Sequence, residues 1–90
     1  MSHTVAPQPA PDVDALIPTV VLYDVMREAA NRLRGELVQL EREHPAEAAD
    51  YRHARYSVAD RADAVDATDR RAIAEADADF RAELAQLLAA

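Results

Sequence analysis

Two pairs of residues in the chain have the spacing of metal ligands on a helix. Glu41 and His44 form one carboxylate–x–x–histidine pair, and Asp50 and His53 form the other. Residues three apart lie on the same face of a helix, so both side chains of a pair can reach one ion. In di-iron carboxylate bundles, Glu-x-x-His pairs are joined by further glutamates from neighbouring helices. The spacing therefore raises the hypothesis of a metal-dependent helical bundle.

Asp50 and His53 are the better candidate of the two pairs. The other pair straddles a helix end, because the residue before Pro45 is pushed out of the α region. With 17 acidic residues and three histidines in the chain, one such pair is expected by chance. A solvated face of ion pairs is the favoured interpretation, and a metal-dependent bundle that uses Asp50 and His53 is the alternative.

Other catalytic chemistry is poorly represented in the sequence. The chain has no cysteine, which excludes disulfides, thiol catalysis and the usual structural zinc sites. A single glycine leaves no glycine-rich phosphate loop. A few helices with an alanine-rich seam rarely enclose the concave pocket that an enzyme needs. We therefore expect a non-catalytic protein that uses no cofactor.

A row of carboxylates is the most regular charged feature of the chain. Asp60, Asp63, Asp66 and Asp69 follow one another at three-residue intervals. Regular carboxylates on a helix can imitate the phosphates of DNA, so an acidic, DNA-mimicking inhibitor of a nucleic-acid-binding protein is an alternative function. A solvated helix face is the simpler interpretation. The net charge of −7 argues against direct binding of nucleic acid, which needs clustered basic residues.

All of these side chains must be positioned by helices. Apolar residues between Val20 and Leu40 recur at intervals of three or four, which keeps them on one side of a helix. This leucine stripe consists of Leu22, Met26, Ala29, Leu33, Leu37 and Leu40. Abundant alanine, arginine and glutamate also favour helix, and glycine-rich turns are missing. The sequence predicts an all-α fold.

The chain is expected to hold one helical domain. Residues 1–14 contain three prolines among small and polar residues, which predicts a disordered tail. Within the domain, residues 15–90, we expect helices at about 18–43, 46–66 and 68–88. Pro45 marks a short turn after the first helix, which predicts an antiparallel helical hairpin. Its second arm is either one long helix or is broken near Asp66–Asp69, where Thr68 could cap a third helix.

The beginning of the first helix has an alternative interpretation. Val20–Tyr23 has high β propensity, and a strand followed by two helices is the layout of ribbon-helix-helix DNA-binding dimers. The segment has no basic residue with which to read a DNA groove, so we favour helix. Further along, Gly35 lies on the polar side, where it is either a weak point or a place for close helix packing.

Length and composition favour an interaction module. A chain of 90 residues buries only about 60% of its unfolded surface, and large apolar side chains are sparse after Leu40. We expect a bundle completed by self-association, as a homodimer or higher oligomer, or by another protein. The predicted interface residues are Leu22, Met26, Leu33, Leu37, Leu40, Phe80, Leu84 and Leu87. The predicted function is a protein–protein interaction module, such as a small regulatory or accessory subunit of the antitoxin or anti-defence type.

Neither a membrane span nor a secretion signal is expected. The longest apolar run falls well short of the ~18 residues that a membrane-spanning helix needs. The N-terminus lacks a charged segment followed by an apolar one, which a secretory signal would have. We therefore expect a cytoplasmic protein with no membrane partner.

Overall fold

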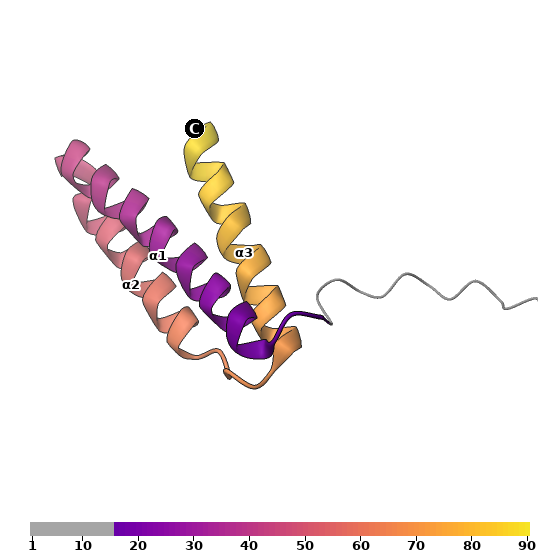
Figure 1. Ribbon diagram of the computed structural model, residues 1–90. Coiled ribbons are helices and arrows are strands. Elements are labelled where there is room, and N and C mark those ends of the chain that lie inside the picture. The colour runs from indigo at the N-terminus through magenta and orange to yellow at the C-terminus, as the bar shows by residue number, and fades with distance from the viewer. Residues whose placement is uncertain (1–15) are drawn as a thin grey trace, which may run out of the picture.

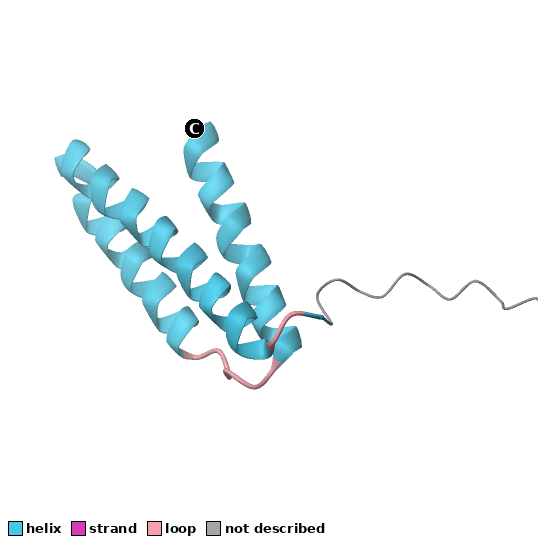
Figure 2. Cartoon of the chain, in the orientation of Figure 1, coloured by secondary structure: helices cyan, strands magenta, loops and turns pink. Residues whose placement is uncertain are grey.

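The chain folds as α-helices. The computed structural model describes residues 16–90, and its helices are α1 (Thr19–Glu43), α2 (Ala48–Asp63) and α3 (Arg70–Ala89). A single 3₁₀ turn, η2 (Pro45–Glu47), joins α1 to α2 (Figures 1 and 2). No strand occurs in the described part, which confirms the prediction of an all-α fold. The predicted disordered tail, residues 1–14, lies outside the described residues.

Helix α1 is the centre of the structure. It packs against α2 on one side and against α3 on the other, whereas α2 and α3 barely touch each other. Small residues widen the leucine stripe so that it can serve both neighbours: Ala29 and Ala30 are buried together with Met26 and Leu33. Figure 1 shows that α2 lies along α1, while α3 leans away from it toward its C-terminal end.

Ion pairs near the two ends of α2 define its direction. Near the start of α1, Arg27 Nη1 lies 2.7 Å from Asp63 Oδ1, at the end of α2. Near the end of α1, Glu41 Oε1 lies 2.8 Å from Arg52 Nε, in the first half of α2. Helix α2 therefore runs back along α1, as Figure 1 also shows.

Helix α3 runs in the same direction as α1. Its first residue, Arg70, donates from Nη1 to the carbonyl oxygen of Ile17 at 2.7 Å and to Thr19 Oγ1 at 3.0 Å. Both acceptors lie where α1 begins, so the two helices start side by side. The helices α1, α2 and α3 therefore have an up–down–up arrangement, in which α1 packs against each of the other two.

Most of the predicted interface residues lie in the core of the single chain. Met26, Leu33, Leu37, Phe80 and Leu84 are buried, and Leu22, Leu40 and Leu87 are partly buried. The rest of the core is formed by Ala29, Ala30, Val58, Ala62 and Ile73. The chain's own α2 and α3 cover the leucine stripe to a large extent. Self-association through these residues stays a prediction.

The second arm is broken between α2 and α3. Within the loop 64–69, the Asp66 carboxylate accepts hydrogen bonds from the Thr68 amide at 2.8 Å and from its hydroxyl at 2.7 Å. These bonds lower the pKa of Asp66. The cap of α3 is Asp69 rather than Thr68, because its carboxylate accepts from the amide of Ala72 at 3.0 Å. Each carboxylate satisfies backbone groups that a continuous helix would have bonded internally.

The strand alternative for Val20–Tyr23 is wrong. These residues form the first turns of α1, and their burial follows helical rather than strand periodicity. Val20 and Val21 are both exposed, whereas Leu22 and Tyr23 are both partly buried against the core. A strand would have placed alternate residues on opposite faces. Packing of the leucine stripe outweighs the local β propensity.

Gly35 lies in open space inside α1. A Cβ atom built at this position has no neighbour within 4 Å, so the alternative of a closely packed second helix is wrong within the described chain. We expect Gly35→Ala to raise the free energy of unfolding by about 0.5–1 kcal/mol, because alanine loses less backbone entropy in a helix. Urea denaturation followed by circular dichroism measures the change, with the exposed Arg32→Ala as a control, because arginine and alanine differ little in helix propensity. A decrease in stability would contradict the open surroundings of this residue.

Candidate functional site

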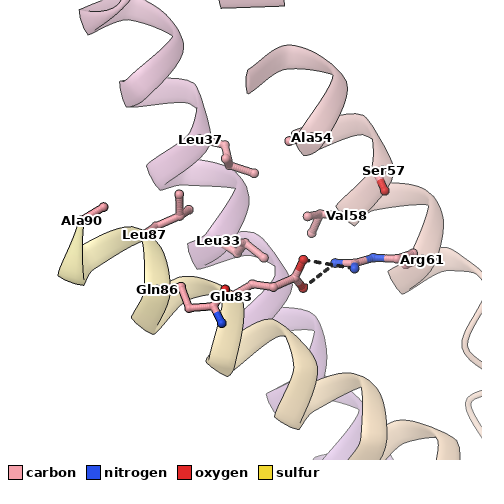
Figure 3. A pocket seen from close by; sticks show the side chains of 10 residues that line it. All are labelled: Leu33, Leu37, Ala54, Ser57, Val58, Arg61, Glu83, Gln86, Leu87 and Ala90. Atoms are coloured by element: carbon pink, nitrogen blue, oxygen red, sulfur yellow. Dashed lines mark hydrogen bonds and ion pairs between the residues drawn. The ribbon is translucent and has the colours of Figure 1, made fainter. Parts of the chain in front are cut away.

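The lean of α3 leaves an apolar groove between α2 and α3. Leu33 and Leu37 of α1 form its floor, as Figure 3 shows. Val58 and Ala54 of α2 line one wall, and Leu87 of α3 lines the other. The groove has a volume of about 360 Å³. Its three leucines all belong to the interface residues predicted from the sequence.

An ion pair crosses the groove between its walls. Arg61 on α2 donates two hydrogen bonds to the carboxylate of Glu83 on α3, at 2.6 and 3.2 Å (Figure 3). The same guanidinium lies over the ring of Phe80, 5.0 Å from its centroid. Both partners of the ion pair are partly exposed, so it contributes at most about 1 kcal/mol to stability. Its main effect is to tie together two helices that otherwise barely touch.

The rim of the groove is acidic. Helical spacing places Asp50 one turn before Ala54 on the α2 side, and Asp79 one turn before Glu83 on the α3 side. Both aspartates are exposed. Among the described residues that line the groove, Arg61 is the single cation, and Glu83 neutralises it. The two rim aspartates therefore leave an excess of negative charge beside an apolar floor.

The candidate metal ligands do not form a site. Asp50 and His53 are both exposed on α2, and His44 lies against Tyr51 with 6.0 Å between the ring centroids. Within residues 16–90, no three histidine, aspartate or glutamate side chains come close enough to hold one ion. The alternative of a metal-dependent bundle has no geometric support in the described part.

Glu41 binds arginines instead of acting with His44. Its carboxylate accepts from Arg55 Nε at 2.9 Å and from Arg52 Nε at 2.8 Å. These hydrogen bonds, first that from Arg55 and then that from Arg52, lower the pKa of Glu41. This cluster was not predicted from the sequence. The only signal available was the turn at Pro45, which brings these two arginines of α2 back beside the end of α1.

The predicted acidic face is not one helical row. Asp60 and Asp63 belong to the last turns of α2, whereas Asp66 and Asp69 lie in the loop that follows. Asp63 pairs with Arg27, and the two loop carboxylates accept backbone hydrogen bonds. All four side chains are exposed, but the helix end at Asp63 removes the regular spacing that a phosphate mimic needs.

Comparison of the chain with protein-family models, with curated proteins and with solved structures finds no match. Function must therefore be inferred from the geometry of the chain itself. None of the helices in residues 16–90 combines the length and the apolar character that crossing a membrane requires.

Proposed function

We propose that this chain is a non-catalytic protein–protein interaction module that binds an amphipathic helix of its partner. The observation that carries the proposal is the apolar groove between α2 and α3. Helix α1 already contacts two helices, and a third helix placed in the groove would contact α1, α2 and α3 together. The product would be a four-helix bundle, in which the added helix lies between α2 and α3 and packs on the floor formed by α1. Insertion of an amphipathic helix into an apolar groove is a common mode of peptide recognition.

The charge of the rim indicates the kind of helix. Asp50 and Asp79 flank the apolar floor and have no ion-pair partner within residues 16–90. A partner helix with arginine or lysine beside its apolar stripe would complement them, whereas an acidic helix would be repelled. A second copy of this chain carries a net charge of −7 and is the poorer fit. A small regulatory or accessory subunit acting on a basic helical segment is the function most consistent with this surface.

Two synthetic peptides of 18 residues test the proposal. Both carry leucine at helical positions i, i+3, i+4 and i+7, and one has arginine and the other glutamate at the flanking positions. We expect the basic peptide to bind in fluorescence anisotropy and the acidic peptide to bind at least tenfold more weakly, about 1.4 kcal/mol. If neither peptide binds, the proposed interaction module is refuted. Equal affinities of the two peptides would support the groove as a binding site for a helix but would contradict its preference for a basic partner.

A pair of variants on α2 locates the binding surface. Ser57 is exposed and lines the groove, so Ser57→Trp should fill it without disturbing the core. Ala49 is also exposed on α2 but does not line the groove, which makes Ala49→Trp the matched control. We expect the first change to weaken binding of the basic peptide by tenfold or more, and the second to leave it unchanged. Equal effects of both changes would place the binding surface elsewhere.

A further inference from the structure

A second hollow lies on the other side of α2, where α1 and α2 are joined. It has a volume of about 400 Å³ and shares no lining residue with the groove. Arginines from both helices converge on it: Arg42 from the last turn of α1, and Arg52 and Arg55 from α2. Among the described residues of its lining, Glu41 is the one acidic side chain. Three guanidiniums and one carboxylate leave an excess of two positive charges, in a chain whose net charge is −7.

The arginines keep most of their donors available. Glu41 accepts only the Nε protons of Arg52 and Arg55. Within residues 16–90, the terminal amino groups of Arg52 donate no hydrogen bond, the guanidinium of Arg55 also interacts with Tyr56, and Arg42 has no ion-pair partner. A guanidinium has five donor protons, and two neighbouring ones suit the oxygens of a phosphate or carboxylate. The hollow therefore presents unused donors together with unbalanced positive charge.

The position of Arg55 is fixed before any ligand arrives. Its guanidinium lies over the ring of Tyr56, 4.6 Å from the centroid, and its Nε donates to Glu41 at 2.9 Å. The side chain of Glu41 is itself only 14% exposed. An arginine held on two sides loses little further conformational entropy when it binds an anion. Glu41 therefore acts as a positioning residue and leaves the outer edge of the guanidinium open.

We propose that this hollow binds a phosphate monoester. At neutral pH such a group carries a charge of about −1.5 to −2, which matches the excess of two positive charges better than a carboxylate does. Val38, Pro45 and Ala48 supply apolar lining on which the organic part of the ligand can rest. The site is independent of the helix-binding groove.

Phenyl phosphate is the probe for this site, and phenyl sulfate, which has the same shape but a single charge, is its control. NMR titration of the arginine Nε–Hε and backbone amide signals measures both affinities. We expect phenyl phosphate to shift the signals of residues 38–55 and to bind at least fivefold more tightly than phenyl sulfate. Equal affinities, or shifts spread over the whole chain, would reject the site.

Variants assign the binding to the arginines of the hollow. Arg42→Gln removes no ion pair within residues 16–90 and should weaken phenyl phosphate binding roughly tenfold, the equivalent of one charge-assisted hydrogen bond. Arg32 is also exposed on α1, has no ion-pair partner within residues 16–90 and does not line the hollow, so Arg32→Gln is the matched control and should have no effect. An equal loss in both variants would mean general charge attraction and would overturn the proposal.

A short phosphoserine peptide distinguishes the source of the phosphate. Tighter binding of this peptide than of phenyl phosphate would indicate a phosphorylated protein segment as the natural ligand. Weaker binding would indicate a small organic phosphate, since the hollow would then accept the group but not a flanking peptide chain. Both results support recognition of a phosphate monoester. If neither probe binds, the proposal is contradicted.

Discussion

Replacing Leu33 by aspartate is expected to unfold the protein. Leu33 is 2% exposed and lies on the stripe of α1 that serves both neighbouring helices. Truncation of a buried leucine typically costs about 2–5 kcal/mol, and an unpaired buried carboxylate adds a desolvation penalty. Because domains of this size are stable by only about 5 kcal/mol, the variant should lose its helical circular dichroism. A urea titration of the purified variant measures the loss.

The same change at an exposed leucine provides the control. Leu88 is 62% exposed on α3, so Leu88→Asp should change the free energy of unfolding by no more than about 0.5 kcal/mol. The oligomeric state of both variants should be measured by light scattering. A Leu33→Asp variant that stays helical but changes from oligomer to monomer would mean that the leucine stripe is an interface between chains rather than the core of one.

Replacing Phe80 by alanine is expected to release α3. Phe80 is the largest fully buried side chain within residues 16–90 and the main apolar anchor of α3, together with Ile73 and Leu84. Phenylalanine-to-alanine changes in a core cost about 3–5 kcal/mol. Since α3 packs on α1 and barely touches α2, the loss of stability should first cause α3 to detach and unfold. Hydrogen exchange should show the amides of α3 losing protection while those of α1 and α2 retain part of theirs.

A conservative change at the same position separates size from shape. Phe80→Leu keeps most of the apolar volume, so it should lower the free energy of unfolding by less than half as much as Phe80→Ala. Arg71→Ala, at a side chain that is 90% exposed, should leave α3 in place. Uniform loss of protection in all three helices of Phe80→Ala would show that the bundle unfolds as one unit and that α3 has no separate stability.

The helices could be predicted because their signals are local. The spacing of Met26, Leu33 and Leu37 identifies the buried face of α1, and those three side chains are buried. Pro45 places the end of that helix within one residue of Glu43. The ends of α2 and α3 were harder to place. Asp66 and Asp69 hold the loop by hydrogen bonds to nearby backbone groups, and many other aspartates in the chain could have done the same.

The sequence does not show which surface covers each apolar helix face. Periodicity shows that Leu33 and Phe80 must be covered, but it does not say whether a neighbouring helix or a second chain covers them. The answer depends on the loop 64–69, which returns α3 to the start of α1. The groove escaped prediction for the same reason, because Arg61 and Glu83 are 22 residues apart and meet only after both helices have packed on α1. The arginine hollow depends instead on how the turn at Pro45 sets α2 against the end of α1, which periodicity does not specify.

The two sides of α1 are covered by segments at very different distances along the chain. Glu41 and Arg52 are 11 residues apart, so α1 and α2 can close on each other early in folding. Arg70 and Ile17 are 53 residues apart, and the entropy of loop closure rises with that separation. The α1–α2 pair should therefore form first on the folding pathway, and docking of α3 should be the slower event. On the ribosome, α1 is complete long before α3 has been synthesised, so one side of its leucine stripe remains uncovered during translation.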